Sequence, residues 1–130
     1  MRNFIMCFIF ITALASCNKF NNKVIFENKS DKIVDSVLVF GNPHCKPLVF
    51  YNIKPNEVAK GNLLNCTQEG GDGSYYIKVY FNKMLKENNS GYYTNGYPIF
   101  SEMLISFDNE YNIICKENNK IYWYRITAFK

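Results

Sequence analysis

The amino-acid sequence predicts an all-β protein, and three observations lead to this prediction. The chain has 10 tyrosines and 11 phenylalanines, and together with many isoleucines and valines they favour the pleated, half-buried surface of a sheet. Turn-forming residues, above all asparagine and glycine, separate the apolar segments at short intervals. Helix-forming residues gather only in segment 82–88, which is long enough for a marginal helix at best.

The predicted strands are bounded by residues that end a sheet. Loop 41–47 contains two prolines, which offer no backbone donor to a neighbouring strand. Segment 54–57 places Pro55 at the second position of a turn, and the glycines of segment 65–73 give a strong turn signal. The strands expected between these and further polar turns are 24–27, 33–40, 48–53, 58–64, 75–81, 92–94, 103–107, 111–115 and 121–129.

Strand 75–81 is the clearest of these strands and indicates how the sheet packs. Its residues alternate between two faces, so one face is buried against a core. Short strands with turns about every 8 to 12 residues are typical of an antiparallel sandwich or a small barrel. We expect an immunoglobulin-like or fibronectin-type sandwich of about seven to nine strands. One face of strand 75–81 carries Tyr75, Ile77, Val79 and Phe81, and the other carries Tyr76, Lys78 and Tyr80.

The start of the chain has the three parts of an export signal. Arg2 supplies a positive charge, segment 4–14 is apolar, and small residues precede Cys17. The apolar segment is shorter than the about 20 residues that span a bilayer, so we do not expect a transmembrane anchor. Leu14-Ala15-Ser16-Cys17 resembles the lipobox of bacterial lipoproteins.

This resemblance implies that Cys17 receives a diacylglyceryl group and becomes the first residue of the mature protein. Its amino group is usually acylated as well, and two or more acyl chains anchor a protein stably. The implied organisation is a signal peptide at 1–16, a lipidated tether at 17–22 and a single β domain at 23–130. The implied location is a bacterial cell envelope, with the lipid bilayer as a partner. The residue after Cys17 is Asn18 rather than the aspartate that retains lipoproteins in the inner membrane. The outer membrane is therefore favoured weakly.

The remaining cysteines lie in a compartment that permits disulfides. Cys45 falls in the loop between the second and third predicted strands, and Cys66 in the loop between the fourth and fifth. These two loops emerge at the same end of a sandwich, so we predict a Cys45–Cys66 bridge that contributes about 3 kcal/mol. Cys115 lies in a strand and is expected to be a small buried hydrophobe. The alternative is that all three cysteines stay reduced.

Chemistry-bearing residues are few, and we expect neither an enzyme, a metal site nor a cofactor. His44 is the single histidine and adjoins Cys45, but metal sites need three or four ligands. The carboxylate pairs Glu69/Asp72 and Asp108/Glu110 sit in turns, where acidic side chains satisfy the turn itself. Loss of Arg2 lowers the formal net charge from +4 to +3, and these charges are too scattered to indicate nucleic-acid binding.

Segment 91–98 is the strongest candidate for function. Its tyrosines offer contact area to a sugar ring or a protein at little cost in conformational entropy. The alternative is a hairpin, because Asn95-Gly96 is the preferred dipeptide of a type I′ turn. The candidate binding surface comprises Tyr92, Tyr93, Asn95 and Tyr97.

The sequence therefore predicts a membrane-anchored, non-enzymatic binding module for an envelope protein or a glycan. One alternative is a structural or assembly component of an envelope complex, which should expose an apolar patch or an open sheet edge. Another is a small periplasmic inhibitor or immunity-type protein, which should present a protruding loop such as 65–73.

Overall fold

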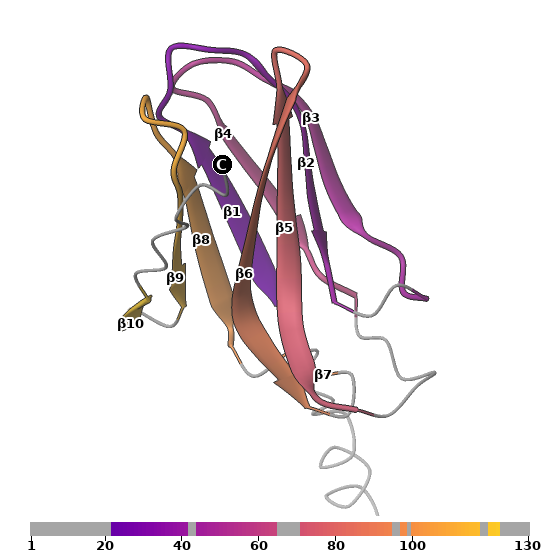
Figure 1. Ribbon diagram of the computed structural model, residues 1–130. Coiled ribbons are helices and arrows are strands. Elements are labelled where there is room, and N and C mark those ends of the chain that lie inside the picture. The colour runs from indigo at the N-terminus through magenta and orange to yellow at the C-terminus, as the bar shows by residue number, and fades with distance from the viewer. Residues whose placement is uncertain are drawn as a thin grey trace, which may run out of the picture.

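The computed structural model describes residues 22–41, 44–64, 71–94, 97–98, 100–117 and 120–122 of the 130-residue chain. For residues 94, 97, 98 and 120–122 it describes the backbone only. This part of the chain forms two sheets that lie face to face (Figure 1). The predicted signal peptide at 1–16 and most of the tether lie outside the described residues.

Ten strands account for the regular structure of the described residues. None of these residues is helical, and so none forms a helix that could cross a membrane. The strands are β1 (Lys23–Asn28), β2 (Val34–Phe40), β3 (Leu48–Ile53), β4 (Val58–Asn62), β5 (Gly73–Phe81), β6 (Met84–Thr94), β7 (Tyr97–Pro98), β8 (Glu102–Phe107), β9 (Ile113–Glu117) and β10 (Lys120–Tyr122).

The predicted all-β sandwich is confirmed, but its strand order is not that of an immunoglobulin domain. Sheet A has the order β10-β9-β8-β1-β4, and sheet B has the order β3-β2-β5-β6-β7. Immunoglobulin constant domains place their first, second, fourth and fifth strands in one sheet. Here the second and fifth strands lie in the sheet opposite to the first and fourth. All neighbours are antiparallel except β1 and β8, which pair in parallel.

The marginal helix expected at 82–88 is wrong, because this segment is a turn followed by the first residues of β6. Asn82 and Lys83 both have positive φ, at 44° and 61°. Two such residues form the tight connection that suits the twist of a hairpin. Residues after Lys83 therefore fold back on β5, from the Phe81–Met84 pair to the Gly73–Tyr93 pair. This long hairpin places the start of β6 at Met84, well before the strand that the sequence predicted at 92–94.

The core lies between the sheets, and the alternation predicted for strand 75–81 is confirmed. Phe81 packs against Phe107 with ring centroids 4.9 Å apart, and Tyr111 covers both rings. The buried hydrophobic residues are Val24, Phe26, Val34, Val37, Val39, Phe50, Ile53, Leu63, Tyr75, Ile77, Val79, Phe81, Phe100, Met103, Ile105, Phe107, Ile113 and Cys115. Burial of Cys115 agrees with its expected role as a small hydrophobe.

Polar contacts join the two sheets along the β6–β9 edge. The Asn88 side-chain amide donates to the carbonyl of Ile113 at 3.0 Å. The Ser90 hydroxyl donates to Glu117 Oε1, also at 3.0 Å. Because these groups are buried and bonded, they close this edge without leaving an unsatisfied polar atom.

Candidate functional site

The tyrosine-rich segment that the sequence singled out is a hairpin with only part of its surface free. Thr94 pairs with Tyr97, as the hairpin interpretation predicts, and this leaves a two-residue connection. Tyr92 is exposed, and its hydroxyl bonds to Asp72, which raises the pKa of the phenol. Asn95 and the side chain of Tyr97 lie outside the described residues.

Tyr93 of this segment packs against the core and is half-buried. Its ring meets Tyr75 edge-on, with centroids 5.3 Å apart. Gly73 lies directly beneath the ring, and a Cβ atom at that position would come within 2.7 Å of Tyr93 Cζ. Burial raises the pKa of Tyr75 far above its ordinary value. Tyr93 therefore packs, half-buried, against the lower end of the core.

A broader aromatic surface lies on the outer face of sheet B. Along each strand the residues between the buried positions point to solvent, and strand pairing brings them into register across the sheet. We call this surface the tyrosine face. It comprises Ser36, Leu38, Phe40, Val49, Tyr51, Tyr76, Lys78, Tyr80, Leu85, Glu87 and Asn89.

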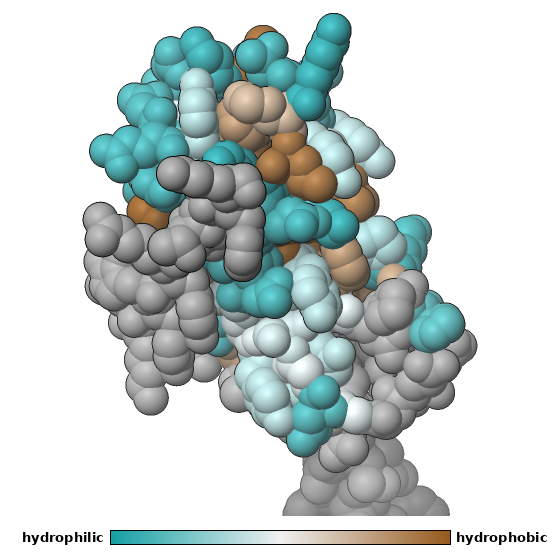
Figure 2. Space-filling model, viewed as in Figure 1, coloured by the Kyte–Doolittle hydropathy of each residue, from teal (hydrophilic) through white to brown (hydrophobic). Residues whose placement is uncertain are grey.

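The composition of the tyrosine face is unusual for a solvated sheet. The solvent side of an antiparallel sheet is normally polar. Here Tyr51 is 74 % exposed, Tyr76 47 % and Leu85 44 %, and aliphatic side chains fill the positions between them. Figure 2 shows brown apolar atoms at the surface over the upper parts of β5 and β6. Exposed apolar patches of this kind mark interaction sites.

The outer face of sheet A provides the contrast within the same molecule. Lysines and glutamates alternate there with aliphatic residues, and they form ion pairs such as Lys23–Glu102 at 3.2 Å. Glu27 accepts hydrogen bonds from Lys29 and Ser106, and the bond from Lys29 is the main reason that its pKa is lowered. The exposed apolar side chains are therefore concentrated on the outer face of sheet B rather than sheet A.

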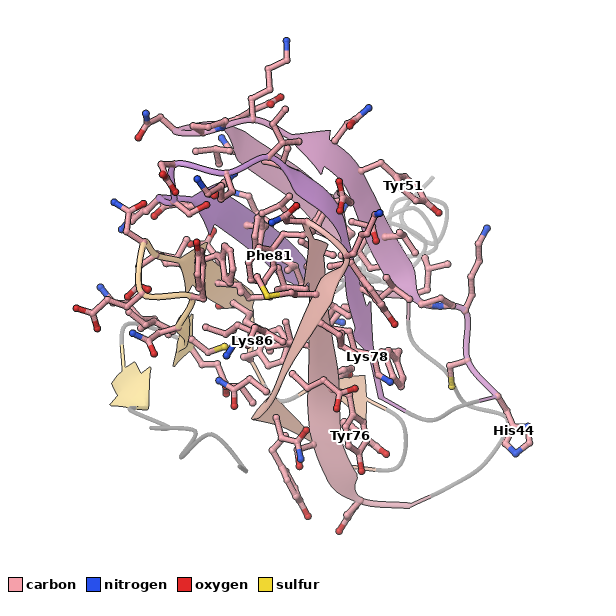
Figure 3. The ribbon with its side chains drawn as sticks, turned by 45° about the horizontal axis from the view of Figure 1, so that its top comes forward. His44, Tyr51, Tyr76, Lys78, Phe81 and Lys86 are labelled. Atoms are coloured by element: carbon pink, nitrogen blue, oxygen red, sulfur yellow. The ribbon has the colours of Figure 1, made fainter. Side chains whose placement is uncertain are left out.

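The middle of the tyrosine face holds a fixed arrangement of rings and charges. The rings of Phe40 and Tyr76 stack with centroids 5.6 Å apart. Lys78 Nζ lies 5.7 Å from the centroid of the Phe40 ring and 2.8 Å from Glu87 Oε1, and the bond to Glu87 raises the lysine pKa. Figure 3 shows Tyr76 and Lys78 along β5 and Tyr51 on β3, whereas Phe81 lies between the sheets. The face thus presents flat rings around an internally neutralised pair.

A shallow hollow continues the tyrosine face around the edge of β3. It encloses about 390 Å³, and Val49 and Tyr51 form the boundary that it shares with the face. The other residues that line it are Lys46, Pro47, Leu48, Asn62 and Leu64. It therefore lies between the edge strands of the two sheets, close to the loop that contains Cys45.

The residues considered for chemistry do not come together in the described part of the chain. His44 sits exposed in its loop and points away from the body of the protein (Figure 3). Asp108 accepts bonds from the backbone amides of Glu110 and Asn112, which is the turn role predicted for it. Among the described residues there is no group of three or more metal-ligating side chains.

The predicted bridge between Cys45 and Cys66 stays a prediction, because Cys66 lies outside the described residues. The neighbouring geometry agrees with it. Lys46, next to Cys45, and Leu64, the last residue described before Cys66, line the same hollow at one end of the sandwich.

Comparisons with known proteins show no family for this chain. The sequence matches no protein-family model and no curated protein. A solved structure described as "NMR structure of the protein from Eubacterium rectale" is similar, with a TM-score of 0.47 and 10% sequence identity. The match covers 80% of this chain and 94% of that one. A likeness at this level carries no argument about the site.

Proposed function

We propose that the protein is a lipid-anchored module of the bacterial cell envelope that binds a glycan or a protein on its tyrosine face, without catalysis. The observation that carries this proposal is the aromatic and aliphatic composition of a sheet face that solvent should make polar. The resemblance of Leu14-Ala15-Ser16-Cys17 to a lipobox supports the anchor. The earlier candidate, the hairpin at 91–98, contributes one exposed tyrosine, Tyr92, and is the weaker surface.

Between the two ligand classes, the geometry favours an extended glycan. Tyr51 and Tyr80 are both in register with Ser36, which puts their strands two spacings, or about 10 Å, apart. That separation is close to the length of two sugar units in an extended β-linked chain. The polar groups of Ser36, Lys78 and Glu87 lie between the rings and can bond to sugar hydroxyls.

The charges of the tyrosine face indicate that the ligand is neutral. Its cation and its anion, Lys78 and Glu87, pair with each other, so the face has no net charge to offer to an ionic ligand. A protein partner is the second candidate, and the exposed aliphatic side chain of Leu85 favours it. That candidate includes the assembly component, which would also use an apolar patch.

Alanine at Tyr51 or Tyr76 should weaken binding to a neutral polysaccharide about tenfold each, since a lost ring contact costs about 1.5 kcal/mol. The measurement is retardation of the mature chain in native gels that contain xylan, glucomannan or hydroxyethylcellulose. Val58→Ala is the matched control, because Val58 is as exposed as Tyr76 but lies in β4 of the opposite sheet. Tyr92→Ala tests the hairpin separately, because Tyr92 pairs with Ser74 at one end of the same outer face. Loss of binding in Tyr92→Ala alone would move the site to the hairpin.

Envelope fractions separate the remaining outcomes. Binding that survives protease but is lost after periodate oxidation supports a glycan, and the reverse supports a protein. Absence of binding to any polysaccharide and to any envelope fraction would overturn the binding function. Separately, an unmodified Cys17 in membrane-free protein would overturn the anchor.

A further inference from the structure

The directions of the strands fix which end of the sandwich carries the tether. The Lys23 amide donates to the carbonyl of Ser101 at 3.0 Å, and the Leu63 amide donates to the carbonyl of Asn22 at 2.9 Å. The start of β1 therefore lies beside the start of β8 and the end of β4. We call this the tether end.

Alternation of strand direction assigns the other segments to one end or the other. The end of β2, the start of β3, the start of β5 and the end of β6 all lie at the tether end. The turns at 29–33, 54–57, 82–83 and 108–112 lie at the opposite end, which we call the far end (Figure 1).

The reach of the tether decides which end can meet the membrane. Residues 17–22 span at most about 20 Å when fully extended. The 11-residue strand β6 runs the length of the sandwich and is about 37 Å long. A lipid attached at Cys17 therefore cannot be brought to the far end, and the tether end is the one held against the bilayer.

Described residues at the tether end have the chemistry of a membrane interface. Leu64 is 71 % exposed, Tyr92 is 43 % exposed, and Pro47 and Lys46 are also exposed. Lys46 forms no ion pair with any described residue. Tyrosine suits a surface that is apolar on one side and wet on the other, and a lysine stem can lie on apolar groups while its amine meets a lipid phosphate.

We propose that the tether end is a bilayer-contacting surface, with Leu64 and Tyr92 in the headgroup layer and Lys46 against lipid phosphates. The inference rests on the proposed anchor at Cys17. The strands then stand upright on the membrane, and the tyrosine face looks sideways along the surface. A ligand must therefore approach in the layer next to the bilayer, within about the 37 Å height of the sandwich.

Depth-dependent quenching tests this orientation on the acylated protein. Leu64→Trp and Ile33→Trp each add an indole at an exposed aliphatic position, the first at the tether end and the second at the far end. In phosphatidylethanolamine–phosphatidylglycerol vesicles, brominated lipids should quench the fluorescence added by Leu64→Trp at least twofold more than that added by Ile33→Trp. Equal quenching, or stronger quenching of the Ile33→Trp protein, would overturn the proposal.

A second measurement needs no substitution. Hydrogen exchange of the unaltered acylated protein, compared between vesicles and detergent, should show bilayer protection around Leu64 and none in the 29–33 turn. Uniform exchange in both conditions would again overturn the orientation. If the protein carries no acyl group and does not float with vesicles, the anchor itself fails, and that result is distinct from an acylated protein that lies differently.

Discussion

Replacing Asn28 with alanine should lower the free energy of unfolding by about 3 kcal/mol, because several buried polar groups lose their partner at once. Asn28 is fully buried. Its side-chain amide donates to the carbonyls of Lys32 at 2.7 Å and Ile53 at 3.0 Å. Its Oδ1 accepts from the amide and the hydroxyl of Ser30, at 3.1 Å and 2.7 Å.

The backbone of Asn28 also joins β1 to the turn between β3 and β4, and the substitution leaves these bonds in place. Its amide donates to the carbonyl of Glu57, and its carbonyl accepts from the amide of Asn56. Its side-chain bond to Ile53 connects β1 of sheet A with β3 of sheet B at the far end. In Asn28→Ala the buried Ile53 carbonyl loses the donor that Asn28 supplies.

Urea unfolding, followed by circular dichroism, measures this loss. Asn28→Asp should be about as damaging as alanine, since it keeps the acceptor but loses both donors and places a carboxylate oxygen near two carbonyls. Asn89→Ala is the control, because Asn89 is exposed, and surface substitutions usually stay within about 0.5 kcal/mol. A loss below about 1 kcal/mol in Asn28→Ala would show that the network is not needed.

The fold class was predictable because it depends on local signals. Alternation in strand 75–81 marks its buried face, and the prolines of loop 41–47 mark a break between strands. The strand order was not predictable. The parallel pairing of β1 with β8 joins residues such as Phe26 and Ile105, and nothing in either strand specifies this partner. Short apolar strands fit either sheet, and loop lengths alone did not separate the possibilities.

The tyrosine face was missed for a related reason. The sequence placed Tyr76, Lys78 and Tyr80 on the second side of one strand, but a binding surface appears only when neighbours are known. Tyr51 joins Tyr80 through β2 in the folded sheet. The available signal was that strand 75–81 carries aromatic residues on both sides, whereas a sheet with one solvated face should alternate with polar residues. Asn28 follows directly on the strand predicted at 24–27, and nothing in the sequence indicated that its side chain bonds to Ile53 of a distant strand.

The protein should lose stability steeply as the pH rises above 9, and Cys115 should account for much of this loss. Its thiol is 1 % exposed, and burial raises its pKa to about 12, against an ordinary value of 9.0. Ser90 bonds to the thiol and opposes the shift, whereas Glu117 adds to it.

The direction of the effect follows from proton linkage. Above pH 9 the thiol ionises in the unfolded chain but stays protonated in the folded protein, so the unfolded state binds fewer protons and becomes favoured. At pH 10.5 the difference amounts to about 1.5 pH units, or about 2 kcal/mol, and it grows until the pH reaches about 12. Tyr75 acts in the same direction above pH 10, because burial raises its pKa as well.

A comparison of unfolding at pH 8 and pH 10.5 isolates the cysteine. Cys115→Ala should cost stability at both pH values through the small cavity it leaves, but its loss between the two should be about 2 kcal/mol smaller than that of the unaltered protein. Cys115→Ser should show the same reduced loss, since a hydroxyl does not ionise in this range. Lysines, tyrosines and the other cysteines are common to all three proteins and cancel in the difference. Equal alkaline losses in all three would mean that the thiol ionises as readily in the folded protein as in the unfolded chain, and its burial in the core would then be wrong.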